Sequence, residues 1–195
     1  MLINNKKIIL SSNSPRRQQL LRDLGLEFEV KTMDTDESYP ENLDSEEVAT
    51  YLAEKKAGTF LPSLKKDEVL ITADTVVIAN NTILNKPLNE NEAFNMLELI
   101  NGKSHLVTTG VCIADMDKKF TFCDKTEVSF SKLSQEEIAY YISQFKPFDK
   151  AGAYGIQEWI GLVGIDHIKG SYYNVMGLPV NKVYQTLKAN YNLVL

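Results

Sequence analysis

Residues 8–17 of the chain read IILSSNSPRR, a short apolar run that passes directly into a polar one. The apolar part predicts a buried strand. Ser14 and Pro15 predict a helix start, because serine caps helix N-termini and the fixed φ of proline suits the first helical turn. A strand, a short polar loop and a helix start bring unpaired backbone amides and the positive end of the helix dipole to one point. We therefore expect an α/β fold with an anion site formed by this loop.

Two interpretations of this loop stay open on its own residues. Arg16 and Arg17 offer planar, permanently charged forks that match phosphate oxygens. A capped surface helix with two solvated arginines accounts for the same residues equally well. The rest of the chain has to decide between the two.

The composition predicts a globular protein that does not bind nucleic acid. The chain has 195 residues, of which 44% are hydrophobic and 24% charged, enough for one substantial core or two small lobes. We expect a single domain spanning residues 1–195. A formal net charge of −5 argues against a general nucleic-acid binder, which usually displays a basic face. Any anionic ligand must therefore be held by a local cluster of positive groups.

The cysteines and the hydropathy pattern favour a cytoplasmic location. Cys112 and Cys123 lie in strand-like segments without a CxxC motif or a nearby histidine, so neither a zinc site nor a disulfide framework is indicated. No long apolar stretch follows the N-terminal lysines, and no run of about 18 apolar residues occurs. We expect no signal peptide, no membrane partner and reduced thiols.

Strand and helix patterns alternate along the chain, and the middle contains a strand pair with a turn near Asp117. Beyond the first strand and helix, strands are expected at 26–32, 69–79, 105–114 and 120–130, and helices opening at Asp44, Asn89, Ser134 and Pro179. Asp44, Asn89 and Ser134 are each followed three residues later by glutamate, the spacing of a capping box. A mixed central sheet flanked by helices is the expected fold.

Asp74 is conspicuous because it interrupts the most apolar strand of the sequence, residues 69–79. Strand interiors disfavour aspartate, so we expect Asp74 at a strand end that faces a cavity. Asp36, Glu37 and Asp74 together offer oxygen ligands for a magnesium-type ion. Acidic loops are usually solvated, and on the residues alone that interpretation is favoured for Asp36 and Glu37. The apolar surroundings of Asp74 favour a functional carboxylate.

Three lysines and one glycine-rich run complete the candidates. Lys56, Lys86 and Lys150 are individually ordinary surface residues, and they gain weight only if they converge on one phosphate. Residues 151–157 read AGAYGIQ, in which Gln157 offers a donor and an acceptor together. This run either reads the edge of a base or forms a tight turn beside a strand. His105 is isolated, and we expect it to be structural.

Taken in order, these segments resemble the Maf family of nucleoside triphosphate pyrophosphatases over nearly the whole chain. The matching runs are LSSNSPRR at 10–17, KA at 56–57, ADTVV at 73–77, KP at 86–87, TTG at 108–110, DKAGAYGIQ at 149–157 and GSYYNVMGLP at 170–179. Several motifs in a fixed order are far more specific than any single one.

The resemblance implies an α/β fold with a central cleft, similar to the ITPase-like fold of other house-cleaning nucleotide pyrophosphatases. It implies a hydrolase of acid anhydride bonds that cleaves a nucleoside triphosphate to the monophosphate and pyrophosphate. Water would attack the α-phosphorus with the help of a divalent metal cation, Mg²⁺ or Mn²⁺. A homodimer is compatible with the resemblance, although nothing in the sequence demands one.

The matched motifs also imply roles for individual residues. Asp74 corresponds to the proton acceptor of the family, and Glu37 together with Asp74 would hold the metal. The residues that would bind the triphosphate are Ser11, Ser12, Arg16, Arg17, Lys56 and Lys86.

Three positions mark the substrate branch within the family. Arg16, Thr75 and Gln157 resemble members that act on dTTP and UTP, whereas relatives that prefer 7-methyl-GTP tend to carry Trp, Gln and Glu there.

Two residues depart from the usual pattern: Asn85 stands where Gly or Glu is commoner, and Glu158 where Gly is usual. The expected function is therefore dTTP and UTP hydrolysis in the cleaning of the nucleotide pool.

Two other functions are carried as alternatives. The chain would be a nucleotide-binding regulator of cell division or septum formation if it bound triphosphate with little turnover. It would be a phosphatase if it released inorganic phosphate from the γ position. An intact Asp74 with its basic partners argues against a protein that binds triphosphate without turnover, and the identity of the products decides between the two hydrolases.

Overall fold

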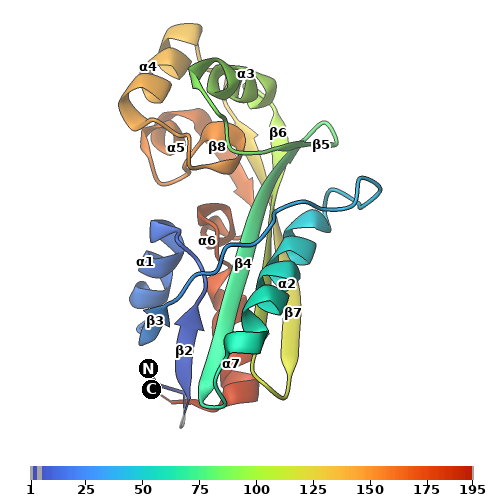
Figure 1. Ribbon diagram of the computed structural model, residues 1–195. Helices are drawn as coiled ribbons and strands as arrows, with labels where there is room; N and C mark the ends of the chain where they lie inside the picture. The colour runs from blue at the N-terminus through green and yellow to red at the C-terminus, as the bar shows by residue number, and fades with distance from the viewer. Residues whose placement is uncertain (1, 4–5, 195) are drawn as a thin grey trace. The chain divides into compact units, whose positions relative to one another are not determined.

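The computed structural model describes residues 2–3 and 6–194 as an alternation of strands and helices (Figure 1). The strands are β1 (Leu2–Ile3), β2 (Lys7–Leu10), β3 (Phe28–Val30), β4 (Glu68–Ala79), β5 (Thr82–Leu84), β6 (Ser104–Ala114), β7 (Lys119–Phe130), β8 (Ile165–Lys169) and β9 (Leu193–Val194). The α-helices are α1 (Pro15–Asp23), α2 (Val48–Phe60), α3 (Glu90–Ile100), α4 (Gln135–Phe145), α5 (Trp159–Gly164), α6 (Tyr172–Met176) and α7 (Val180–Tyr191), with 3₁₀ turns at Leu61–Ser63 and Ala151–Ala153.

The main sheet has seven strands and mixed direction. Its order is β3-β2-β4-β6-β7-β8, with β5 paired to β4. β2 runs parallel to both β3 and β4, whereas β5 and β8 run antiparallel to β4 and β7. The predicted fold class, a mixed α/β sheet flanked by helices, is confirmed. β1 and β9 form a separate antiparallel pair.

The chain divides into two compact units, which are described one at a time. The first unit holds the described residues up to Asp74, residues 109–124, and those from Gly177 onward. The second unit holds residues 75–108 and 125–176. Strands β4, β6 and β7 each contribute residues to both units. A single domain over residues 1–195 stays a prediction.

In the first unit, α2 packs on one face of the sheet. Ala53, Ala57 and Phe60 of α2 form a buried cluster with Ile9 of β2 and Leu70 of β4, and Cys112 and Ala114 of β6 belong to the same cluster. Successive side chains of a strand point to opposite faces of the sheet. The side chains that point to the other face are also buried, and they are Ile8, Leu10, Val69 and Ile71. Figure 1 shows α7 on that other face.

The second unit has a larger apolar core around Tyr141, the largest of its fully buried side chains. This core combines one face of α3 with one face of α4, and adds Val77 of β4 and Phe130 of β7. Ser134 forms the predicted capping box with Glu137 at the start of α4, and Asn89 caps α3 by accepting from the Glu92 amide.

Three local predictions were wrong. Asp44 forms no capping box, because its carboxylate accepts from the Glu46 amide (2.9 Å) in a turn, and α2 begins only at Val48. The second strand is confined to Phe28–Val30 rather than 26–32. Asp74 lies inside β4 rather than at its end, because pairing to neighbouring strands continues on both sides of it.

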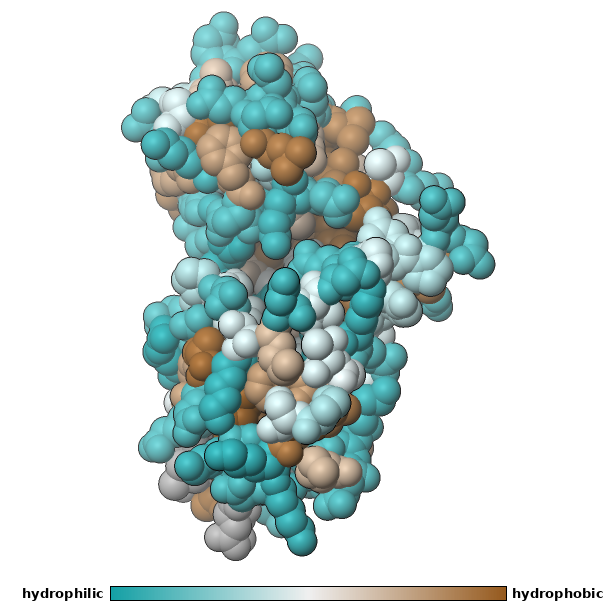
Figure 2. All heavy atoms as spheres, in the orientation of Figure 1, coloured by the Kyte–Doolittle hydropathy of each residue, from teal (hydrophilic) through white to brown (hydrophobic). Residues whose placement is uncertain are grey.

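The face of the molecule drawn in Figure 2 is largely hydrophilic. Figure 2 shows hydrophilic residues over most of the visible face, in keeping with the 24% of residues that are charged. No helix within residues 2–3 and 6–194 combines the length and the apolar character needed to cross a bilayer.

His105 is buried in the second unit, as expected for a structural residue. Its Nε2 lies 2.7 Å from the Tyr154 hydroxyl, and its ring contacts the rings of Tyr154 and Phe130. Burial lowers the His105 pKa from 6.5 to about 4. The neutral form therefore contributes stability that is fully present above pH 6.5 and is lost as the pH falls toward 4.

We predict that the His105→Gln variant loses this acid sensitivity. The difference in unfolding free energy between wild type and variant should shrink by about 3 kcal/mol between pH 7 and pH 4, as measured by urea unfolding. The variant of the exposed His167, His167→Gln, is the matched control, because it keeps His105 and should therefore keep the loss of stability that His105 causes below pH 6.5. A pH-independent difference for His105→Gln would contradict the prediction.

Candidate functional site

The loop after β2 forms the helix start that the sequence predicts. Ser14 is the N-cap of α1, and its Oγ accepts from the Arg17 amide (3.4 Å), with Pro15 at the first helical position. The loop begins beside β4, because the Ser11 amide donates to the Ile71 carbonyl (2.9 Å). Ser12 is buried, and its Oγ accepts from the Ser14 amide (3.3 Å). Strand pairing thus brings the predicted anion loop next to the strand that carries Asp74.

Arg17 connects three segments of the first unit. Its Nη1 donates to the Ala73 carbonyl (2.9 Å) and to Ser12 Oγ (3.3 Å), and its Nε donates to the Gly177 carbonyl (2.8 Å). Burial lowers the pKa of Arg17, and the carboxylate of Asp74 opposes that shift. These contacts make Arg17 a tie between loop, strand and the segment before α7. Its role in binding triphosphate stays a prediction.

Arg16 and Ser11 border the same loop and are both partly exposed. The positive charge of Arg16 lowers the pKa of Arg17 further, whereas the carboxylate of Glu37 raises it, which places both groups within electrostatic reach of Arg17. The first turn of α1 contains no acidic residue. Positive charge therefore gathers at the N-terminus of this helix.

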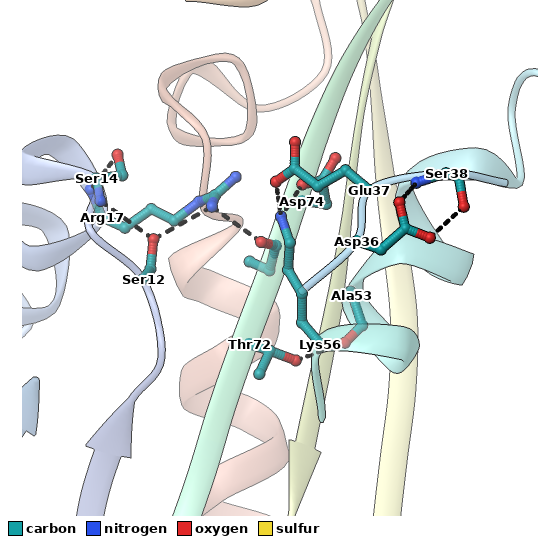
Figure 3. A network of polar contacts seen from close by, with 11 residues as sticks. Ser12, Ser14, Arg17, Asp36, Glu37, Ser38, Ala53, Lys56, Thr72 and Asp74 are labelled. Carbon is teal, nitrogen blue, oxygen red and sulfur yellow. Dashed lines mark hydrogen bonds and ion pairs between the residues drawn. The ribbon is translucent and has the colours of Figure 1, made fainter. Parts of the chain in front are cut away.

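Lys56 holds two carboxylates with one ammonium group (Figure 3). Its Nζ lies 2.5 Å from Oδ1 of Asp74 and 2.7 Å from Oε1 of Glu37. The side chains of Lys56 and Asp74 are mostly buried, at 17% and 14% exposure, whereas Glu37 is exposed. Three separate segments, namely α2, β4 and the loop before α2, therefore meet at one nitrogen.

A buried hydrogen bond between β4 and α2 positions Asp74 next to Lys56. The Thr72 hydroxyl, fully buried in β4, donates to the Ala53 carbonyl of α2 (2.7 Å). Residues two apart in a strand share a face, as do residues three apart in a helix, so Thr72 and Ala53 place Asp74 and Lys56 opposite each other. The sequence analysis missed Thr72. Its signal was a threonine in an apolar strand, two residues before Asp74.

Asp36 turns away from this cluster. Its carboxylate accepts from the Ser38 amide (3.0 Å) and hydroxyl, and it pairs with Lys55 (2.9 Å). The Ser38 hydroxyl and Lys55 lower the pKa of Asp36 well below its usual range. The adjacent acid, Glu37, reaches Lys56 instead. Of the three carboxylates considered from the sequence, the structure thus brings together Glu37 and Asp74 only.

Glu37 and Asp74 fit a divalent cation that also binds phosphate. Among residues 2–3 and 6–194, no three or more His, Cys, Asp or Glu side chains converge as a metal-binding group. The two carboxylates nevertheless converge on one position that already accommodates a positive charge, the Lys56 ammonium. Mg²⁺ commonly takes one or two protein carboxylates and fills its shell with water and substrate phosphates. The donor set therefore suits an ion of this type.

The second unit carries the other candidates. Thr75 is partly exposed in β4, whereas Lys86, in the loop between β5 and α3, and Gln157, in the turn before α5, are exposed. The Gly152 amide donates to the Asn85 carbonyl (3.2 Å), which joins the loop of Lys86 to the run 151–157. The loop that carries Lys86 and the glycine-containing run 151–157 are therefore neighbours within this unit.

Lys150 is buried rather than presented to a ligand. Its Nζ pairs with Asp149 (2.7 Å) and with Oε1 of Glu158 (3.0 Å). The other oxygen of Glu158 accepts from the Tyr141 hydroxyl. This internal network was not predicted from the sequence. Its one signal was Glu158 itself, a charged residue where the family pattern usually has glycine.

Comparison with known proteins identifies the family. The family model described as Maf-like protein matches residues 7–190. A dTTP/UTP pyrophosphatase of Parabacteroides distasonis is 52% identical over 191 residues, which is 96% of this chain and 99% of that protein. Proteins of the same name from Phocaeicola vulgatus and Flavobacterium psychrophilum are 51% and 49% identical, and cover 93% and 92% of this chain and 95% and 92% of their own lengths.

A solved structure shares the fold. The structure of the Staphylococcus aureus Ham1 protein matches 94% of this chain and 99% of its own, with a TM-score of 0.51 and 12% sequence identity. A likeness at this identity concerns the fold alone. The family match and the identities to the three relatives, by contrast, extend over nearly all of the sequence. The chain belongs to the Maf-like protein family.

Proposed function

We propose that this chain is a nucleoside triphosphate pyrophosphatase that converts dTTP and UTP to the monophosphate and pyrophosphate. The names of the related proteins support this substrate class. The observation that carries the proposal is the convergence of Asp74, Lys56 and Glu37 in the first unit. A carboxylate that can accept a proton, a cation and a second carboxylate are the groups that water attack on a phosphate ester or anhydride requires.

The charges of the first unit suit a triphosphate. Arg16 and Arg17 stand at the start of α1, where backbone amides and the helix dipole also favour an anion. Ser11, Ser12 and Lys56 are assigned to the same phosphates. Lys56, Arg16 and Arg17 are three positive groups against the two carboxylates of Glu37 and Asp74. This small excess does not neutralise a triphosphate, so cations that accompany the substrate are expected.

The chemical step needs charge stabilisation and a proton acceptor. Attack of water at the α-phosphorus builds negative charge on the non-bridging oxygens and on the departing pyrophosphate, which the arginines and Lys56 stabilise. Asp74 accepts the proton of the attacking water. Glu37 and Asp74 would hold a divalent cation, Mg²⁺ or Mn²⁺, which supplies further neutralisation of phosphate charge when bound.

The second unit is assigned to recognition. Lys86 would contact a phosphate, and Gln157 would read the base through its amide, which is both donor and acceptor. Arg16 and Thr75 complete the set assigned to dTTP and UTP preference. The cleaning of the nucleotide pool in the cytoplasm is the role that fits this activity, and a homodimer stays a prediction.

The products of one incubation test the activity. With dTTP and Mg²⁺ or Mn²⁺, the chain should release dTMP and pyrophosphate in equal amounts, as followed by ion-exchange chromatography. Release of dTDP and inorganic phosphate would show the γ-phosphatase instead. Tight binding of dTTP without any product would favour the nucleotide-binding regulator.

Removal of the Asp74 charge should abolish most of the turnover. Asp74→Asn keeps the shape of the side chain but cannot accept the proton, so kcat for dTTP should fall at least roughly a hundredfold. Asp36→Asn is the matched control, because Asp36 pairs with Lys55 away from the cluster, and it should keep near wild-type kcat. Circular dichroism verifies the fold of both variants. Equal activity of a folded Asp74→Asn variant would refute the role of Asp74.

A further inference from the structure

Lys56 occupies the position at which the proposed function requires a divalent cation. Its Nζ lies 2.5 Å from Asp74 Oδ1 and 2.7 Å from Glu37 Oε1, so one ammonium binds both carboxylates that are assigned to the metal. The same lysine is also assigned to the phosphates of the substrate. Both assignments hold together only if Lys56 leaves the carboxylates when the substrate binds.

The ammonium and a divalent cation compete for these two carboxylates. The side chains of Asp74 and Lys56 are only 14% and 17% exposed, so water screens little of the repulsion between two positive charges there. The ammonium also neutralises half of the negative charge that Asp74 and Glu37 offer, and carboxylate charge is what a hard cation binds. Lys56 therefore lowers the affinity of the two carboxylates for a metal ion.

The side chain of Lys56 is able to exchange its partners while the backbone stays in place. The Thr72 hydroxyl donates to the Ala53 carbonyl (2.7 Å), which holds α2 against β4 and leaves the exchange to the lysine side chain alone. Lysine carries a point charge on a flexible four-carbon stem, and its ammonium binds carboxylate and phosphate oxygens alike. Arg17, by contrast, is fixed by two backbone carbonyls. Lys56 is thus the cation that a phosphate can draw away.

We propose that Lys56 is an exchangeable counter-ion, which keeps a divalent cation off Asp74 and Glu37 until the phosphates of a nucleotide draw its ammonium away. The proposal rests on the proposed function, because it takes a triphosphate as the group that competes for Lys56. It adds a coupling between two ligands: phosphate and cation each favour the arrangement in which Lys56 has left the carboxylates, so each strengthens the binding of the other.

Direct binding of Mn²⁺ tests the proposal without any turnover. Electron paramagnetic resonance of the free ion gives its dissociation constant for the nucleotide-free chain. Lys56→Gln removes the ammonium and keeps both carboxylates, so it should bind Mn²⁺ at least about tenfold more tightly than wild type. Unchanged or weaker binding by a folded Lys56→Gln variant would overturn the proposal.

Lys55→Gln is the matched control for this variant. Lys55 is the adjacent residue of α2, but it pairs with Asp36 (2.9 Å). Its substitution changes the net charge of the chain by the same amount and should leave the Mn²⁺ affinity as in wild type. An equal gain in both variants would reveal a general effect of net charge, and the specific role of Lys56 would be refuted.

A dUTP analogue with an imido group between the α- and β-phosphorus, which resists cleavage there, tests the exchange itself. The Mn²⁺ affinity of each chain is measured with and without saturating analogue. Coordination of Mn²⁺ by the analogue's own phosphates cancels when the gains of the two chains are compared. The gain should be at least about tenfold larger in wild type than in Lys56→Gln, because only wild type has an ammonium to displace. Equal gains would contradict the exchange.

Wild type alone keeps the proposal testable if circular dichroism shows that Lys56→Gln does not fold. Without nucleotide, wild type should bind Mn²⁺ with a dissociation constant in the millimolar range or weaker. One site of micromolar affinity in the nucleotide-free wild type would overturn the proposal, because the ammonium would then not keep the cation away.

The outcomes separate this proposal from the activity on which it rests. A wild-type chain that hydrolyses dTTP to dTMP and pyrophosphate, with unchanged Mn²⁺ affinity in Lys56→Gln, overturns the counter-ion role alone. A wild-type chain that forms neither product overturns the proposed function. Tighter Mn²⁺ binding by Lys56→Gln in that case would still support the exclusion of the cation by Lys56.

Discussion

The ion pair of Lys56 with Asp74 is the interaction on which the first unit's cluster depends. Without the ammonium, the carboxylates of Asp74 and Glu37 would repel each other in a partly buried place. The Thr72 hydroxyl fixes the pair by holding β4 against α2 at one register. The Lys56 ammonium between two carboxylates ties three segments of the unit together, and under the proposed function the same position would accept positive charge that arrives with phosphates.

Each unit contains a largely buried lysine that pairs with a carboxylate from another segment. In the first unit, Lys56 and Arg17 link separate segments around Asp74 and stay close to the loop of α1. In the second unit, Lys150 is buried against Glu158, and the other oxygen of Glu158 accepts from the Tyr141 hydroxyl, which in turn accepts from the Gly155 amide. Charged groups held from within lose little freedom when a ligand binds, which is the physical content of preorganisation.

Local sequence signals predicted the loop at the start of α1 and the candidate aspartate. The contacts between residues far apart in the sequence could not be predicted. The loop of Ser12, Ser14 and Pro15 was predictable because its cap and its helix start lie within a few residues. Asp74 was found by its chemistry, yet its place inside β4 depends on neighbouring strands far away in sequence. Adjacent acids such as Asp36 and Glu37 look alike in sequence, and only the positions of Lys55 and Lys56 separate them. The ion pair of Lys150 with Glu158 could not be predicted, because the two residues share no helix or strand whose periodicity would place them together.

The position of attack is the most direct test of the account, because Asp74 and its partners are assigned to water attack at the α-phosphorus. Hydrolysis of dTTP in water enriched in ¹⁸O, followed by mass spectrometry of both products, reports which phosphorus received the water oxygen. The account predicts one ¹⁸O atom in dTMP and none in pyrophosphate. Label in pyrophosphate, or in inorganic phosphate, would place the attack at another phosphorus and contradict it.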